Sequence, residues 1–393
     1  MGSFKVDAII IQIEKSFYRL GLWHRGEEAT PRESAKKLFF SVYTLLLPIS
    51  LLSGVSLTSE GKEDKLFLIE AAIMTVIMSV KILYIIWRKD EILQMLDQIG
   101  NYSIKNASEA KRINHRLKMF MNFMKIFFSC SVLIGVCAMF IVPFIGSERK
   151  LFFNIGFPLN WRHSEFAFWA AFTFILTEVA LSAISILFSV IMWYLFLNCG
   201  LRFEALGHDL RDMGIIEEVV DVSGNKRKIS KMEKENQFAK DLVAAIKSYR
   251  EIIDVTGHLE AFLSHIHSTQ IGFSGLCICG SIYCLGYNKP ENSMEFIIYI
   301  VILTYNIFDV FMITYFGNEL NLSSDRLSYC LFQSSWYEYQ FCSKSILILG
   351  ERFKQPVELV ILKLYPLTLE LFVRILNNAY SMFNILKTFA ERV

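Results

Sequence analysis

The sequence predicts an all-α membrane protein with seven transmembrane helices, a cytoplasmic N-terminus and a cytoplasmic layer of anchoring helices. Three observations lead to this fold class. Hydrophobic residues make up 53% of the 393-residue chain and charged residues only 20%, against about 45 to 50% and about 25% in soluble domains. Apolar runs long enough to cross a hydrocarbon core of about 30 Å recur along the chain. Lysine and arginine gather in alternate connections between these runs.

Each expected pass approaches the roughly 20 apolar helical residues that a bilayer requires. The seven passes run over residues 38–55, 66–87, 120–145, 166–198, 262–285, 296–316 and 367–388. The last of them is the most polar. Charges and Pro356 interrupt the segment 345–365, so we expect it to form a cytoplasmic helix and linker.

The orientation follows from the basic residues, which resist translocation and favour the anionic inner leaflet. The N-terminal segment, the second-to-third connection and the fourth-to-fifth connection hold seven, seven and ten lysines and arginines. The alternate loops hold two, three and one. The N-terminus is therefore expected inside and the C-terminus outside, although the sequons at Asn101 and Asn106 would need the opposite face to carry glycans.

The cytoplasmic connections contain helical extensions of the passes. The fourth helix is expected to continue past Asn198 to Leu210, and the fifth to begin near Asp241, so that each reaches about 65 Å at 1.5 Å per residue. Their apolar stripes must then pack on other segments or on another subunit. Near the N-terminus Ile10, Ile13, Phe17 and Leu20 recur at helical intervals. This spacing fits equally a helix lying on the inner membrane surface and a packed helix.

Enzyme chemistry has little support in the sequence. Metalloprotease, nucleotide-binding and nucleophile-elbow motifs are missing, and no cofactor is expected. His258, His265 and His267 are the best metal candidates, but histidines two apart point to different faces of a helix, so no metal site is predicted. A net charge of +2 does not favour nucleic-acid binding. The eight cysteines fall in spans or cytoplasmic segments, which argues against disulfides.

Ionisable residues inside the spans are better indicators, because each costs about 2.5 to 3.5 kcal/mol on insertion scales unless it is paired or hydrated. Lys81, Lys125 and Asp309 fall at similar depth, which predicts a salt bridge from Asp309 to one of the lysines. Glu70 lies near the outer end of the second pass and is expected to reach the headgroups. Glu178 lies near the midplane, where it needs a hydrogen-bond partner, a hydrated cavity or a ligand.

Aromatic and small residues crowd the outer halves of several passes and could line an apolar pocket with a few polar tips. Ordinary helix packing would give the same periodicity, so the pattern leaves both interpretations open. The candidate ligand-binding residues are Met74, Gly135, Met139, Phe172, Phe174, Thr177, Glu178, Tyr299 and Tyr305.

The last pass carries a periodic polar stripe. Asn377, Ser381, Asn384 and Thr388 recur at i, i+4, i+7 and i+11, which places them on one face of a helix, and Lys387 lies beside them. Several copies of this face around an axis could line a pore. Interhelical hydrogen bonds are the equal alternative.

The C-terminal third resembles the insect odorant receptor family. The resemblance rests on the order and spacing of five motifs. They are residues 315–320 (YFGNEL), 334–337 (SSWY), Gln355-Pro356, 365–372 (YPLTLELF) and Tyr380-Ser381. The first 300 residues resemble the family mainly in topology.

The resemblance implies a ligand-gated, nonselective cation channel in which a tuning subunit and a shared co-receptor form a tetramer in the plasma membrane of a sensory dendrite. Its ligand would be a small volatile apolar compound. By position, Asn384 and Thr388 match the narrow pore constriction, with Ser381 and Lys387 flanking it and Asn377 below on the same face. Because the co-receptor places apolar side chains there, this chain resembles a tuning subunit. The anchor through which subunits meet would include Trp336, Tyr337 and the helix from Ile346 to Leu349.

The resulting organisation has four parts. Residues 1–36 form a cytoplasmic N-terminal helix, 37–316 the first six passes with the ligand pocket and helix extensions, 317–365 the anchor helix and linker, and 366–393 the pore-lining seventh helix. The alternative function is a seven-helix G-protein-coupled receptor. It would require the reverse orientation, and the sequence lacks both a DRY-like triplet after the third pass and NPxxY in the seventh.

Overall fold

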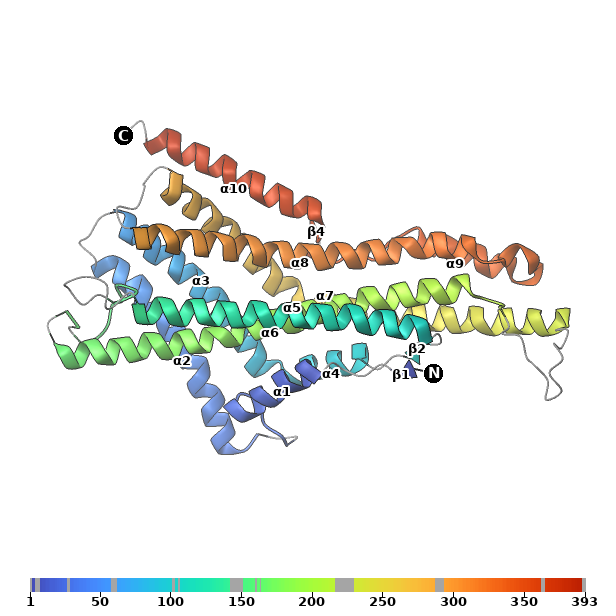
Figure 1. The fold of residues 1–393 in the computed structure, drawn as a ribbon, viewed down its shortest axis with the longest axis horizontal. Helices are drawn as coiled ribbons and strands as arrows, with labels where there is room; N and C mark the ends of the chain where they lie inside the picture. Colours follow the sequence, from blue (N-terminus) through green and yellow to red (C-terminus); the bar gives the residue numbers. More distant parts are fainter. Residues whose placement is uncertain are drawn as a thin grey trace.

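The protein is a bundle of long helices (Figure 1). The computed structural model describes residues 2–3, 8–26, 29–57, 62–100, 103–104, 107–141, 151–159, 161–162, 164–215, 230–286, 293–361 and 365–390. Its α-helices are α1 (Ala8–Leu20), α2 (Pro31–Leu57), α3 (Lys62–Trp87), α4 (Lys89–Gly100), α5 (Ala107–Ile141), α6 (Glu165–Arg211), α7 (Lys231–Gly286), α8 (Ser293–Gln333), α9 (Ser343–Phe353) and α10 (Leu369–Ala390). Two antiparallel pairs of two-residue strands join β1 (Gly2–Ser3) to β2 (Ser103–Ile104) and β3 (Val360–Ile361) to β4 (Tyr365–Pro366).

Each of the seven predicted passes falls on a helix of the described structure. Among the described residues six helices, α2, α3, α5, α6, α7 and α8, are long and apolar enough to cross a membrane. The seventh expected pass, α10, has 22 residues but is not among those six. The all-α membrane class is thus confirmed, while the seventh crossing and the inside N-terminus stay predictions. Residues 142–145, at the end of the expected third pass, and both sequon asparagines lie outside the described residues.

Capping residues fix where two helices begin. At α2 the backbone N–H of Thr30 donates to Glu33 Oε2 (2.9 Å), and the N–H of Glu33 donates back to Thr30 Oγ1 (3.4 Å). This is a reciprocal capping box, and Pro31, directly after Thr30, suits the first helical position. Before α7 the N–H of Ser230 donates to Glu233 Oε2 (2.9 Å). The expected start of this helix near Asp241 was therefore too late.

Three helices are much longer than a bilayer is thick. α6, α7 and α8 contain 47, 56 and 41 residues, or about 70, 84 and 62 Å at 1.5 Å per residue. Figure 1 shows them running together along the long axis, with α9 beside the far end of α8. The expected boundary between residues 316 and 317 falls inside α8, which continues without interruption to Gln333. A continuous helix, rather than a linker, therefore connects the sixth pass to the anchor.

The N-terminal helix packs into the protein. Ile10, Ile13 and Phe17 on α1 are 1%, 7% and 0% exposed, and they belong to the main apolar core. The following Trp23 donates its indole N–H to the carbonyl of Ile85 at the end of α3 (2.8 Å). The packed-helix interpretation is the one the structure supports. Leu20 is half exposed, so the expected stripe ends one turn earlier than its sequence spacing indicates.

A buried polar cluster joins four of the membrane helices. Lys81 Nζ of α3 lies 3.2 Å from Asp309 Oδ2 of α8 and donates to Ser189 Oγ of α6 (2.9 Å). Gln270 of α7 donates its amide to the same oxygen of Asp309. Both charged side chains are nearly inaccessible, at 3% and 6% exposure. The predicted salt bridge is confirmed, and Lys81 is the lysine that forms it. We call these four residues the charge node.

Removing one partner of the charge node should destabilise the fold. The change Asp309→Leu leaves Lys81 buried without a counter-charge, and such a loss costs about 3 to 5 kcal/mol. The double change Lys81→Met with Asp309→Leu should recover most of that stability, because an apolar pair replaces an ion pair with little loss. Thermal unfolding of the detergent-solubilised protein measures both.

The matched control is Glu370→Leu, which breaks the exposed pair between Glu370 and Arg374 (2.7 Å). Exposed pairs contribute about 0 to 1 kcal/mol. Equal melting temperatures for the Asp309 and Glu370 variants would contradict the proposed contribution of the charge node to the stability of the fold.

Candidate functional site

One end of the bundle holds a second apolar core, separate from the main one. Its buried members come from α2, α3, α5 and α6, together with two residues of the segment 151–159. We call it the outer apolar cluster. It consists of Leu47, Leu51, Leu68, Ala71, Ala72, Met139, Leu151, Ile155, Phe168, Ala171, Phe172 and Ile175.

The segment 151–159 closes the outer apolar cluster and was not anticipated as part of it. Its Gly156 donates its backbone N–H to the carbonyl of Ser50 in α2 (2.8 Å). A Cβ atom on Gly54 would lie 2.2 Å from the carbonyl oxygen of Asn154, so only glycine permits this approach. Phe153 of the segment stacks on Phe67 of α3, with ring centroids 5.8 Å apart. The run of apolar residues in the loop before the fourth expected pass was the available signal.

Several candidate ligand-binding residues meet at this cluster. Met139 and Phe172 are buried in it, at 4% and 8% exposure, and Phe174 packs against its edge. Tyr299 of α8 contacts Phe67 edge to face at 5.6 Å. The nearest atom to a Cβ on Gly135 would be a methyl of Val179 on α6, at 3.7 Å.

The remaining candidates lie outside this group. The hydroxyls of Thr177 and Tyr43 hydrogen-bond to each other at an exposed site, so Thr177 does not point into the cluster. Met74 Sδ accepts a long hydrogen bond from Asn306 Nδ2 (3.7 Å). Tyr305 precedes Asn306 on α8, one turn on the outer side of Asp309. Met74, Tyr305 and Asn306 therefore lie between the outer apolar cluster and the charge node.

The two lone glutamates in the spans differ in their surroundings. Glu70 does not reach the headgroups as expected: it is 2% exposed, and Ser281 of α7 donates its hydroxyl to Oε2 (3.1 Å). A Cβ on Gly280 would lie 2.1 Å from Glu70 Oε1, so the glycine makes room for the carboxyl group. Glu178 is 3% exposed, and its Oε1 has no hydrogen-bond partner among the described residues.

The helix α10 has one packed face and one open face. Its packed face lies on α7 and α8, where Ala379 is buried and Phe372 meets Phe311 at 5.5 Å. The four residues of the polar stripe are all exposed. At about 100° per residue, Asn377, Ser381, Asn384 and Thr388 project roughly opposite Ala379. Helix packing within the chain therefore does not bury the stripe.

The hydroxyl groups on this open face donate their protons within the helix and can still accept hydrogen bonds from outside it. Ser381 donates to the carbonyl of Asn377 and Thr388 to that of Asn384, both at 2.9 Å. Each hydroxyl proton is thus used within the helix, and the hydroxyl oxygen keeps an acceptor site. Lys387 is exposed beside Thr388. At the start of the same helix Arg374 donates to Glu370 Oε1 (2.7 Å).

The expected anchor divides into packed and free side chains. Ile346 and Leu349 of α9 are 2% and 7% exposed and pack in the chain's own core. Leu347 and Ile348 on the opposite face are 60% and 74% exposed. Ile346 and Leu349 therefore hold α9 on the chain, and their two neighbours are the ones free to meet another subunit.

The short turn before α9 also contains both packed and exposed side chains. Tyr337 is 68% exposed, and Trp336 is half-buried against Phe332 (6.5 Å). Tyr339 stacks on Phe238 of α7 with centroids 4.2 Å apart. Burial raises the pKa of the Tyr339 hydroxyl, so it stays a neutral phenol. Tyr337 thus adds an aromatic ring to the free surface of α9.

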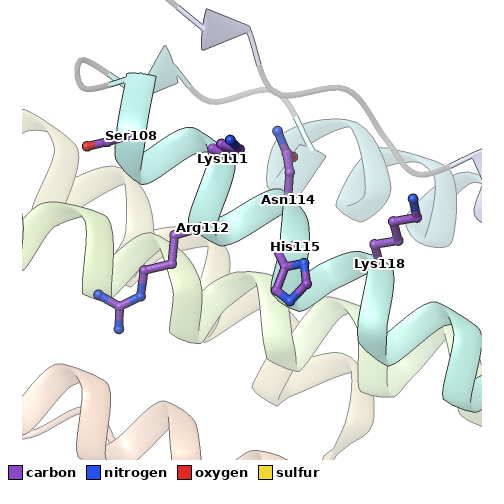
Figure 2. A pocket seen from close by; sticks show the side chains of 6 residues that line it. All are labelled: Ser108, Lys111, Arg112, Asn114, His115 and Lys118. Atoms are coloured by element: carbon purple, nitrogen blue, oxygen red, sulfur yellow. The ribbon is translucent and has the colours of Figure 1, made fainter.

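A surface groove of about 480 Å³ lies on the first turns of α5, at the end of the helix away from the outer apolar cluster (Figure 2). Its lining residues all come from this one helix: Ser108, Lys111, Arg112, Asn114, His115 and Lys118. Arg112 also binds Glu204 of α6 (2.8 Å). An apolar ligand needs most of its surface buried, which a basic groove on a single helix does not provide.

The histidines and cysteines considered for metal or redox chemistry do not form a site in the described structure. Among the described residues no group of three His, Cys, Asp or Glu side chains could hold a metal ion. His267 is buried and contacts the ring of Phe196 at 5.6 Å. All eight cysteines are free thiols.

Comparison with known proteins gives a consistent result. The family model described as 7tm Odorant receptor matches residues 67–380. Odorant receptor 94a of Drosophila melanogaster is 23% identical over 303 residues, which cover 76% of this chain and 73% of that protein. Odorant receptor 10 of Aedes albopictus is 26% identical over 147 residues, which cover 37% of this chain and 39% of that protein.

Solved structures show the same fold. The insect olfactory receptor OR5 from Machilis hrabei superposes with a TM-score of 0.73 at 13% identity, covering 96% of this chain and 98% of that one. Its complex with eugenol gives a TM-score of 0.74 at 12% identity, covering 97% and 99%. At such low identity the match concerns the arrangement of helices and not the side chains of the site.

Proposed function

The chain belongs to the 7tm odorant receptor family, and from this premise we propose that it is a tuning subunit of an odorant-gated, nonselective cation channel. The observation that carries the proposal is the open polar face of α10, which no helix of the same chain covers in the described structure. Family membership makes the protein a receptor rather than an enzyme. A G-protein-coupled receptor, the alternative function, has a different fold from the insect olfactory receptor that this chain matches over nearly its full length.

The ligand site proposed here lies at the outer apolar cluster and the level beneath it. Met139, Phe172, Phe174 and Tyr299 supply apolar and aromatic contact surface, which suits a small volatile ligand. The related OR5 has been solved with eugenol, a compound of this kind. Met74, Gly135, Tyr305 and Glu178 would border the deeper end of such a site, and Thr177 its rim.

The proposed ion path follows the open face of α10. Asn384 and Thr388 present amide and hydroxyl oxygens that can replace part of a cation's hydration shell, with Ser381 and Asn377 below them. Lys387 flanks the outer end. One helix cannot enclose a pore, so the function requires several subunits around an axis, as in the tetramer proposed with a co-receptor. The plasma membrane of a sensory dendrite is the proposed location.

Gating would be a population shift, since a ligand favours the state that it binds more tightly. Contacts from two helices connect the proposed ligand site with α10. On α8, Phe311 contacts Phe372 two residues beyond Asp309 of the charge node. On α7, a Cβ on Gly275 would lie 3.9 Å from Ile375, and one on Gly286 3.4 Å from Phe383. Small shifts of α7 and α8 would therefore move α10 along most of its length.

Adding a negative charge at the proposed constriction should change ion selectivity. Asn384→Asp, in a chain co-expressed with its co-receptor, should raise calcium over sodium permeability about fivefold. The reason is that one additional unit charge at about 4 Å in water is worth about 1 kcal/mol. Reversal potentials in exchanged solutions measure the ratio.

The control is Asn378→Asp on the same helix, which lies about 120° around from Asn384 at 3.6 residues per turn. It should leave the permeability ratio unchanged. An unaltered ratio and unaltered channel block in the Asn384 and Thr388 variants would remove α10 from the ion path.

Charging the free surface of α9 should weaken assembly without unfolding the chain. Leu347→Glu combined with Ile348→Glu places two carboxylates on side chains that are already exposed in the single chain. An assembly buries this surface, so the charges would be desolvated and the yield of complex with the co-receptor should fall at least tenfold. Co-purification and mass photometry of the solubilised complex measure it.

The control substitution is Leu20→Glu. Leu20 is also half exposed, and it belongs to α1, a helix that Figure 1 shows apart from α9. This variant should assemble normally. A doubly charged α9 that assembles as well as the Leu20 variant would exclude this surface from the interface.

A further inference from the structure

Glu178 is a buried carboxyl group to which no residue of the described structure donates a hydrogen bond. Three carboxyl side chains are buried at bilayer depth in the described structure. Asp309 receives hydrogen bonds from Lys81 and Gln270, and Glu70 receives one from Ser281. Glu178 is as inaccessible as the other two, at 3% exposure, but no described residue donates to it. A buried acceptor without a donor costs roughly 1 to 3 kcal/mol, and more when it is charged.

The neighbouring hydroxyls on α6 cannot supply that donor. Ser182, one turn beyond Glu178, donates its proton to the carbonyl of Val179 (2.6 Å). Ser185 donates in the same way to the carbonyl of Ser182 (2.7 Å). Thr177 is turned to its own exposed contact with Tyr43. The local sequence is therefore rich in hydroxyl groups, yet their protons are directed away from the carboxyl group.

Packing explains the open oxygen of Glu70 but not that of Glu178. Glu70 Oε1 occupies the space that a Cβ on Gly280 would need, so its position is set by the close approach of α3 and α7. No comparable glycine faces Glu178 among the described residues. Glu178 instead lies one turn below Phe174 and Ile175, which border the outer apolar cluster. A ligand with its apolar body in the cluster would bring a polar end to this depth.

We propose that Glu178 accepts a hydrogen bond from the bound ligand, so that the receptor selects volatile compounds carrying an O–H or N–H group. Alcohols, phenols and amines would then activate it in preference to ethers, esters and hydrocarbons of the same shape. This inference rests on the proposed function. A site with a buried polar group rejects an analogue that cannot pair with it more strongly than an apolar pocket rejects a change in size.

The test compares two isomers, only one of which carries a hydrogen-bond donor, and an amine of similar length. Hexanol and methoxypentane have the same atoms and nearly the same length, and hexylamine adds a cationic donor. Currents from the chain co-expressed with its co-receptor give the half-maximal concentration for each compound. The wild type should respond to hexanol and hexylamine at concentrations roughly ten- to hundredfold lower than to methoxypentane, which matches the cost of an unpaired acceptor.

Two substitutions of Glu178 separate charge from hydrogen bonding. Glu178→Gln keeps an acceptor oxygen but cannot carry a negative charge, so it should retain the preference for hexanol over methoxypentane and respond to hexylamine less strongly than the wild type does. Glu178→Met removes the acceptor and should bring hexanol and methoxypentane to equal potency. Glu70→Met is the matched control, because Ser281 and Gly280 already account for that carboxyl group. It should leave the ratio of the two potencies as in the wild type.

The outcomes distinguish this inference from the proposed function. Equal potencies in the wild type, or a preference for hexanol that persists in Glu178→Met, would overturn the role of Glu178 and leave the channel assignment intact. Surface-expressed complexes that conduct with none of the three compounds would overturn the proposed ligand class, and the Asn384 variants test the channel separately. Surface labelling of each variant confirms that it folds and reaches the membrane.

Discussion

The constraint behind this structure is that a bilayer interior offers no water to polar groups, so every buried charge or carboxyl group must find its partner in the protein or in a ligand. The charge node satisfies that constraint for Lys81 and Asp309 by drawing in Ser189 and Gln270. Because these residues come from α3, α6, α7 and α8, the node fixes the relative heights of four long helices. It separates an outer half with its own apolar cluster from the main core that extends into the helical extensions.

The same constraint explains what the sequence could predict. A charge in an apolar run is costly wherever its partner lies, so an ion pair between Asp309 and a lysine could be inferred without knowing the fold. Glu70 could not be placed correctly, because its partner Ser281 is 211 positions away and Gly280 matters only once α3 and α7 touch. The start of α7 differs from the expected one for a local reason, because the cap between Ser230 and Glu233 starts the helix before the apolar spacing begins.

The direction in which a side chain points was the other feature that the sequence could not predict. The anchor helix α9 was expected, but sequence spacing alone does not say which of its two apolar faces the chain uses for itself. Ile346 and Leu349 turned inward and Leu347 and Ile348 outward because α8 packs beside α9. The outer apolar cluster presented the same difficulty, since an apolar lining and ordinary packing have the same periodicity. The segment 151–159 completes that cluster through a glycine contact that no helical pattern reveals.

The energetics of gating favour a site that combines a hydrogen bond to a buried acceptor with the burial of apolar ligand surface. Moving a two-state equilibrium from 1:99 to 99:1 needs about 5.5 kcal/mol of differential binding energy. One hydrogen bond to a buried acceptor contributes about 1 to 3 kcal/mol of it. Apolar burial at about 25 cal/mol per Å² can provide the rest only if the open state covers roughly 100 to 180 Å² more of the ligand. In the proposed mechanism the outer apolar cluster therefore closes further around the ligand as the channel opens, and the segment 151–159, which hydrogen-bonds to α2 at Ser50 and Ser53, forms part of the wall that closes.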